Sequence, residues 1–407
     1  MHDIWLRWSD VRELAKGRKV VLFGRSEDWV HKTTPYLPDG ASYIVDNNTE
    51  YEGGEFKGLP VFLPKKLQEE SEGAVFIVIT TGAYQSVSDE LVEAGYVPGK
   101  DFCATPILRD LKLFRDIHEY DQTVILASSD HSEKGSRRFS KAGGGIYTYQ
   151  TGTHKIEKKM EGRFRQVVEG KDVLYTVEFL NNKLYVLSKN FEVIRSFEIP
   201  YANACGLDYY ERDNAFVIAN AADEIHFHDA DTFEVKKKIH FSSKHKFEKA
   251  GHHHINDICV SGESLYVSYF SKSGNWKKEV FDGGIDELSL RDLEGERYTL
   301  MQDLWMPHSP KVLDGTLCYV ESMKGRLYLG NRNLGAEFQG FVRGIAYDGT
   351  YYFVGQSEHM YLHRLIGESN NLMLNAGFYL LDPEKKISRF FSCPDFVNIH
   401  DVHVLSK

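Results

Sequence analysis

Five stretches of the sequence place a polar or small residue at the start of an apolar strand. They read Cys205-Gly206-Leu207, Asn256-Asp257-Ile258, His308-Ser309-Pro310, Arg343-Gly344-Ile345 and His400-Asp401-Val402. If these strands are the innermost strands around one axis, the residues at the same step of each strand face one another. We therefore expect His308, Arg343 and His400 to converge, with His254 or Asn256 beside them.

The expected ring of side chains combines two chemistries. Imidazoles from His254, His308 and His400 suit a divalent transition metal such as Zn²⁺, Mn²⁺ or Fe²⁺. Arg343 cannot lose its charge, so it would repel a cation and pair with a carboxylate or phosphate of a ligand. Three interpretations stay open: a metal site, an anion or glycan site without metal, and a polar network with trapped water.

The candidate catalytic residues are His308, His400, Arg343 and Glu321. Imidazole titrates near neutral pH, so the histidines would exchange protons there. Glu321 follows the second strand of its unit and would be the general base. A purely structural role at the mouth of the channel is the alternative for Glu321.

A second candidate site lies near the N-terminus. Gly24, Arg25 and Ser26 form the turn after the first apolar strand, and Asp46 closes the second strand about 20 residues later, as in dinucleotide-binding folds. Only the first of the three glycines of that fingerprint is present. The turn therefore predicts either a nucleotide or nucleotide-sugar site or a degenerate domain that serves as a scaffold.

A repeated hairpin pattern indicates the architecture of the larger part of the chain. The repeats are VEFLNNKLYVLS, LDYYERDNAFVIAN, ICVSGESLYVSYF, KVLDGTLCYVES and IAYDGTYYFVGQS. Strand, polar turn and aromatic strand recurring in this way predict an all-β propeller over residues 121–407. Residues 397–405 lack a hairpin partner and are expected to pair with residues 122–128. Six blades are favoured and seven are possible.

The first 107 residues show a different rhythm. Continuous apolar runs such as KVVLF and AVFIVI alternate with helical stretches, which predicts a small parallel sheet covered by helices. The predicted fold class is thus an α/β Rossmann-like domain over residues 1–107, a connecting helix over residues 108–120, and the propeller.

Two resemblances accompany these patterns. The strings KVVLFGRSEDW, YIVDNN, FKGLPVFLPKKL and VITTGAY resemble the Rossmann-like module found with bacterial sugar-modifying enzymes, which implies carbohydrate metabolism by association. The strings MPHSPKVLDGTL, ESMKGRLYLG and GFVRGIAYDGTYYFVGQS resemble an uncharacterised family of bacterial propeller proteins with PHSP and GFxRGxA patterns. These patterns contain His308 and Arg343, and they imply a fold without a settled activity.

Composition narrows the partners. The net charge of −10 without a basic block argues against nucleic acid and against anionic membranes. No apolar run reaches the roughly 20 residues that a spanning helix needs. Five isolated cysteines and a start without a signal-peptide pattern predict a cytoplasmic protein. The oligomeric state is left open.

Together these features predict an enzyme or ligand-binding protein of bacterial glycan or nucleotide-sugar metabolism. An acidic or sugar-like small molecule would bind at the His- and Arg-lined mouth of the propeller channel, with or without a divalent metal. The alternative is a non-catalytic propeller scaffold that recognises a protein partner and carries a degenerate nucleotide-binding domain.

Overall fold

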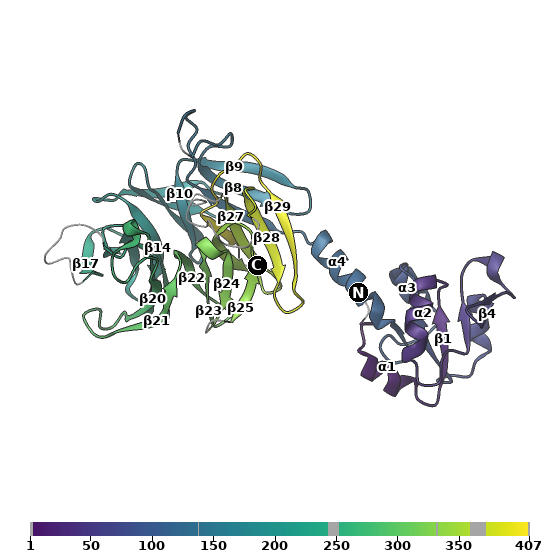
Figure 1. The fold of residues 1–407 in the computed structure, drawn as a ribbon. Helices are drawn as coiled ribbons and strands as arrows, with labels where there is room; N and C mark the ends of the chain where they lie inside the picture. The colour runs from purple at the N-terminus through teal and green to yellow at the C-terminus, as the bar shows by residue number, and fades with distance from the viewer. Residues whose placement is uncertain (1–2, 137, 243–251, 331–332, 359–371, 406–407) are drawn as a thin grey trace. The chain divides into compact units, whose positions relative to one another are not determined.

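The computed structural model describes residues 3–136, 138–242, 252–330, 333–358 and 372–405. The chain divides into two compact units, Met1–Glu119 and Tyr120–Lys407. The elements of both are labelled in Figure 1. Among the described residues, no helix combines the length and the apolar composition that a membrane crossing requires.

The first unit is built on a six-stranded sheet with the strand order β3-β4-β2-β1-β5-β6. The apolar runs form its centre, in β1 (Lys19–Phe23), β2 (Tyr43–Val45) and β5 (Val75–Ile79), which pair in parallel. These strands are buried along almost their whole length. The other elements are β3 (Glu55–Phe56), β4 (Leu59–Phe62), β6 (Phe102–Ala104), α1 (Trp8–Ala15), α2 (Glu27–Thr33), α3 (Tyr84–Glu93) and α4 (Arg109–Glu119).

The predicted Rossmann-like α/β fold is wrong. That fold joins consecutive parallel strands through α-helices. Here the chain passes from β2 to β4 through a single 3-10 turn, Thr49–Tyr51, and the antiparallel strand β3. It passes from β4 to β5 through Pro64–Glu69, which is again a 3-10 helix and only six residues long. The unit is a mixed sheet with incomplete helical cover, and the chain as a whole is mostly β.

The second unit is a β-propeller of six four-stranded antiparallel blades. We number the blades in chain order from the first that is continuous in sequence. Blade 1 is β10 (Phe164–Glu169), β11 (Val173–Glu178), β12 (Lys183–Ser188) and β13 (Val193–Glu198), and blade 2 is β14 (Ala204–Tyr210), β15 (Ala215–Asn220), β16 (Glu224–Asp229) and β17 (Val235–His240). Blade 3 is β18 (Ile255–Ser261), β19 (Ser264–Tyr269), β20 (Gly283–Ser289) and β21 (Arg297–Leu304), blade 4 is β22 (Pro307–Leu313), β23 (Thr316–Glu321), β24 (Arg326–Leu329) and β25 (Leu334–Glu337), and blade 5 is β26 (Phe341–Tyr347), β27 (Tyr352–Ser357), β28 (Gly377–Asp382) and β29 (Ile387–Ser392).

The sixth blade joins the two ends of this unit and closes the propeller. Its innermost strand, β30 (Asp401–Val404), pairs antiparallel with β7 (Thr123–Ser128), which is followed by β8 (Gly145–Gln150) and β9 (Lys155–Glu161). The expected pairing of residues 397–405 with residues 122–128 is therefore confirmed. The preference for six blades over seven is confirmed as well.

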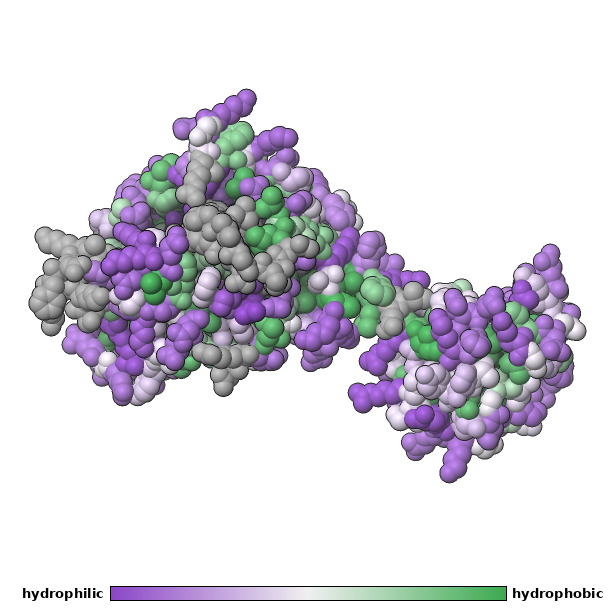
Figure 2. All heavy atoms as spheres, viewed as in Figure 1, coloured by the Kyte–Doolittle hydropathy of each residue, from purple (hydrophilic) through white to green (hydrophobic). Residues whose placement is uncertain are grey.

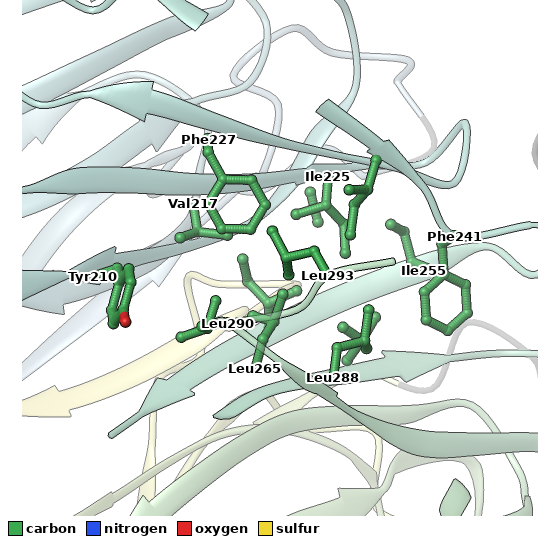
Figure 3. Packing of buried hydrophobic residues seen from close by; sticks show 14 of the residues in the cluster. Tyr210, Val217, Ile225, Phe227, Phe241, Ile255, Leu265, Leu288, Leu290 and Leu293 are labelled. Atoms are coloured by element: carbon green, nitrogen blue, oxygen red, sulfur yellow. The ribbon is translucent and has the colours of Figure 1, made fainter. Parts of the chain in front are cut away.

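Apolar side chains of neighbouring blades interlock between the sheets. Between blades 2 and 3, Val217 and Ile225 belong to the same buried cluster as Leu265 and Leu288 (Figure 3). The burial of such apolar surface is the main force that holds blades together. The face seen in Figure 2 is mostly hydrophilic, with hydrophobic residues in small separate groups.

Near the axis, hydrogen bonds from backbone to side chain connect the innermost strands. Neighbouring blades belong to separate sheets here, so their buried backbone N–H groups need other partners. At five of the six junctions a side chain of one blade accepts a backbone N–H of the next: Gln166 from Leu207 (2.7 Å), Asp208 from Val260 (2.6 Å), Asp257 from Ser309 (2.7 Å), Ser309 from Gly344 (2.9 Å) and Asp401 from Val167 (3.0 Å). We call these five side chains the axial ring.

At the sixth junction, between blades 5 and 6, the ring position is Gly344, and a side chain of the second strand is the acceptor instead: Ser357 of β27 accepts the backbone N–H of Ile399 at 3.1 Å. Gly344 adopts φ +74°, and a Cβ atom there would lie 2.4 Å from the backbone nitrogen of Val402. Glycine is therefore needed at position 344 for two reasons: the backbone has a left-handed conformation, and the backbone of Val402 lies too close for a Cβ atom. The same junction lies one residue after Arg343, so it also determines where that side chain begins.

Replacing Gly344 by Ala should destabilise the propeller by about 3 kcal/mol or more, because backbone atoms cannot move away from the new methyl group. Gly349→Ala is the matched control: it also has a positive φ of +91°, but open space surrounds its Cβ position. The control should lose only about 1 to 2 kcal/mol. Urea unfolding followed by tryptophan fluorescence measures both, and equal losses would contradict the packing explanation.

Candidate functional site

The structure brings the residues before the ring positions together around one cavity. This cavity, which we call the axial pocket, has a volume of about 70 Å³. All six blades except blade 2 contribute, and the lining residues are Arg138, Arg165, His254, Asn256, Phe270, His308, Phe341, Arg343 and His400. Arg165, Asn256, His308, Arg343 and His400 each directly precede the ring position of their strand. In blade 2 the ring residue Asp208 lies two residues beyond Gly206, which aligns with the other ring positions, and Cys205 before Gly206 donates its thiol to the carbonyl of Ile255.

Arg343 is buried, with 3% of the residue exposed, and several hydrogen bonds hold its side chain in place. Its Nη2 donates to Ser357 Oγ at 2.9 Å and to Asn398 Oδ1 at 3.0 Å. Its Nη1 lies 3.0 Å from both ring nitrogens of His400, and since guanidinium only donates, His400 accepts. The guanidinium also lies 5.0 Å from the ring centre of Phe341. These contacts fix a permanent positive charge in the wall of the pocket.

His308 is buried in a defined tautomer. Its Nδ1 lies 2.9 Å from the carbonyl oxygen of Met306, which can only accept, so Nδ1 carries the proton. Ser322 Oγ is also within 2.7 Å of this nitrogen. In the neutral ring, Nε2 then bears a lone pair. The rings of Phe270 and Phe341 lie 5.2 and 5.7 Å from the imidazole and keep it in place.

Two buried carboxylates position the segments that carry His254 and His400. Asp223 accepts the backbone N–H groups of residues 252, 253 and 255, at distances of 2.5 to 3.2 Å. Asp130 accepts the N–H groups of residues 397 and 398, both at 2.9 Å. These acids follow the second strands of their blades, and their charge is directed into the backbone. The pocket therefore gains positioned imidazoles without gaining a lining carboxylate.

All three imidazoles of the pocket stay neutral at pH 7. Burial, followed by the charge of Arg165, lowers the pKa of His254 to about 4. Burial, followed by the charge of Arg343, holds the pKa of both His308 and His400 well below the usual range of histidine. None of these three histidines therefore titrates near neutral pH, where we expected them to exchange protons. The positive charge of the pocket comes from guanidinium groups alone.

Arg165 supplies the second of these charges, and Arg138 the third. The guanidinium of Arg165 lies 4.5 Å from the ring centre of Phe179. Among the residues that the structure describes, Arg165 forms no ion pair, and its buried Nε has no hydrogen-bond partner. Of the described residues, neither an Asp nor a Glu lines the pocket. Three lining guanidiniums make it attractive to an anion.

Glu321 does not line the axial pocket. Its carboxylate is 2% exposed and accepts the backbone N–H of Trp305 at 2.9 Å and the hydroxyl of Tyr328 at 3.2 Å. Lys324 pairs with it at 3.2 Å. These contacts hold together the corner of blade 4. Glu321, the predicted general base, therefore has a structural role and does not reach the axial pocket.

The predicted metal ligands share the pocket but do not form a recognisable metal centre. Within the described ranges of the chain, no three His, Cys, Asp or Glu side chains are grouped closely enough to hold an ion. The cationic neighbours of His254, His308 and His400 also disfavour a second positive charge. A Zn²⁺, Mn²⁺ or Fe²⁺ ion at these histidines stays a prediction.

The residues predicted to bind a nucleotide lie together in the first unit: Gly24, Arg25 and Ser26 form the turn after β1, and Asp46 directly follows β2. Both carboxylate oxygens of Asp46 accept backbone N–H groups, at 2.9 Å each, one of them from Arg25. The guanidinium of Arg25 lies 3.4 Å from the ring centre of Tyr51. A Cβ on Gly24 would meet the side chain of Thr81 at 2.6 Å. Each feature is thus explained by the packing of the turn, and a nucleotide there stays a prediction.

Sequence reasoning missed Arg165 and Arg138. Arg165 precedes Gln166 just as His400 precedes Asp401, so aligning the strand before the first hairpin with the other five would have found it. Arg138 lies between β7 and β8, outside the regular strands, and no repeat signal points to it. Phe270 and Phe341, which separate the imidazoles, look like ordinary strand residues in the sequence.

Comparisons with known proteins place the second half of the chain in a family. A family model described as "Domain of unknown function (DUF4915)" matches residues 203–407. No curated protein matches the chain. Among solved structures, it is similar to a protein of unknown function from Bacteroides caccae (12% identity, TM-score 0.49) and to a chain of a nidogen/laminin complex (11% identity, TM-score 0.48). Each similarity covers 71% of this chain and 100% of the other.

The neutral imidazoles predict that the propeller loses stability in acid. An unfolded histidine titrates near pH 6.5, and the folded His308 binds its proton only at much lower pH. The unfolded state thus binds more protons between these values, so stability present above pH 6.5 is lost as the pH falls. Between pH 7.5 and 5, the wild type should lose about 2 kcal/mol more than His308→Gln.

Urea unfolding at several pH values measures this difference. His31→Gln, an exposed histidine of the first unit, is the control for removing any histidine. Parallel pH curves for the wild type and His308→Gln would contradict the burial of a neutral imidazole.

Proposed function

The chain belongs to the family described as a domain of unknown function, DUF4915, and we propose that its propeller binds a small acidic molecule whose anionic group enters the axial pocket. The observation that carries the proposal is the charge of the pocket: guanidinium groups of Arg138, Arg165 and Arg343 line it, and within the described part of the chain no carboxylate does. Guanidinium is the side-chain group best matched to carboxylate, phosphate or sulfate oxygens. Asn256, whose amide has no hydrogen bond within the described residues, adds a neutral donor.

The volume of the axial pocket determines which part of the ligand can enter it. A volume of about 70 Å³ corresponds to two or three water molecules at roughly 30 Å³ each. Sites that enclose a whole ligand measure roughly 300 Å³ or more. Only the acid group therefore fits, and the rest of the ligand lies outside. A sugar acid has this form, with one anionic group on a neutral ring, which is the physical support for a role in glycan or nucleotide-sugar metabolism.

The geometry favours ligand binding over acid–base catalysis. A general base works best when its pKa lies near the working pH, and burial keeps the pKa of His308 and His400 far below it. The neutral imidazole of His308 is suited to accept a hydrogen bond from a hydroxyl group or from a protonated acid, whereas His400 already accepts one from Arg343 and has only its N–H left to donate. We therefore assign His308 and His400 to ligand orientation and Arg343 to charge recognition.

We extend the proposal to the location of the protein and to its partners. All five cysteines are buried and unpaired, as expected in the reducing cytoplasm. The ligand is a small molecule in this proposal, and neither nucleic acid nor membrane is a partner. A propeller scaffold without a ligand is the competing function, and it makes no use of an arginine-lined pocket.

Binding of inorganic sulfate, measured by isothermal titration calorimetry, tests the proposal. Arg165→Gln removes a charged donor and should weaken sulfate binding at least tenfold, about 1.4 kcal/mol. Arg195→Gln is the matched control, because Arg195 lies on the outermost strand β13, away from the pocket. Its affinity should equal that of the wild type.

Two results would overturn the proposal. One is a wild-type protein that binds no sulfate at millimolar concentration, which would favour the scaffold. The other is a stoichiometric metal in elemental analysis that disappears in His308→Ala, which would favour the metal site.

A further inference from the structure

A fourth guanidinium, that of Arg163, lies beside the axial pocket without belonging to its lining. Arg163 precedes β10 by one residue, and Arg165 lies on that strand. The two guanidinium groups lie 4.9 and 4.5 Å from the ring centre of the same residue, Phe179. They are therefore separated by no more than about twice those distances. Two like charges so close repel each other unless an anion lies near both.

The protein does not supply that anion through a direct ion pair. Within the described residues, neither Arg163 nor Arg165 pairs with a carboxylate. The nearest acids have other partners: Glu178 accepts the backbone N–H of Arg163 at 3.0 Å and that of Leu180 at 3.3 Å. Asp130 accepts the backbone N–H groups of residues 397 and 398. Glu178, Asp130 and Glu133 act on Arg163 through space, but within the described residues none of them forms an ion pair with either guanidinium.

Neighbouring residues orient Arg163. Its Nη2 donates to the imidazole of His131, and its Nε donates to the carbonyl of Ser129 at 3.4 Å. The backbone of His131 in turn donates to the carbonyl of Arg138 at 2.8 Å. Arg138 lines the axial pocket, so one connected group of residues reaches from the pocket to Arg163. Burial, and then the charges of Arg163 and Arg138, lower the pKa of His131, which leaves it a neutral acceptor.

We propose that Arg163 provides an outer anion subsite beside the axial pocket, and that the ligand is a small diacid with one anionic group in the axial pocket and a second on Arg163. The inference rests on the proposed function and adds the ligand class. A sugar acid that also carries a phosphate has the required chemistry, because its two anionic groups are carried by different carbons of one ring. Arg165 lines the pocket and shares the ring of Phe179 with Arg163, so it lies within reach of both groups.

Three sugar ligands test the inference by calorimetry on the full chain. Glucuronate carries only a carboxylate, glucose 1-phosphate only a phosphate, and glucuronate 1-phosphate carries both. The diacid should bind the wild type at least tenfold more tightly than either monoacid. Arg163→Gln should abolish this advantage and leave the monoacids within twofold of the wild type, and Arg163→Lys should retain part of it because it keeps the charge.

The other outcomes separate the two proposals. If the monoacids bind but the diacid gains nothing, or if Arg163→Gln weakens all three ligands equally, the outer subsite is wrong and the axial pocket stands. If none of the three ligands binds the wild type, both proposals fail. Arg195→Gln, on the outermost strand of blade 1, should match the wild type for every ligand.

Discussion

The backbone N–H groups around the propeller axis are the constraint on which the rest of this structure depends. Six innermost strands from six separate sheets meet there, and their buried N–H groups must find partners outside the sheets. The axial ring supplies them, from Gln166 in blade 1 to Asp401 in blade 6. Burial raises the pKa of its members Asp208 and Asp257 to about 6. In every blade except blade 2, the residue that precedes the ring position then lies at the axial pocket.

The positive charge of the pocket follows from the same need to pair backbone N–H groups. Acidic side chains near the channel mouth are used on backbone groups: Asp223 and Asp130 hold the segments before β18 and β30, and Glu321 holds a corner of blade 4. Guanidiniums cannot be used in this way at N–H groups, because they only donate. The arginines therefore stay directed toward the cavity, and the imidazoles beside them lose their affinity for protons. The proposed anion site rests on these arginines, two of them on innermost strands and Arg138 on the segment between β7 and β8.

The sequence predicted the repeats better than the connections. Hairpins with a polar turn and an aromatic strand recur because every blade must bury both faces, so six blades and the closing pair of β30 and β7 could be predicted. Apolar runs such as Val75–Ile79 predicted buried strands, but nothing in them distinguishes an α-helical crossover from the 3-10 segment Pro64–Glu69, and the Rossmann-like interpretation failed there. At the site, His308 and Arg343 followed from the shared register. Arg138 could not be predicted, because its position depends on an irregular segment between β7 and β8. The partners of Glu321 could not be predicted either, because they depend on the geometry of a turn.

The identity of the group in the axial pocket is the central claim, and anomalous diffraction from crystals of the full chain soaked in selenate measures it directly. We predict a selenium peak within hydrogen-bonding distance of the guanidinium groups of Arg165 and Arg138. A metal ion bound by His254, His308 and His400, or selenate bound only on the outer surface while water fills the pocket, would contradict it.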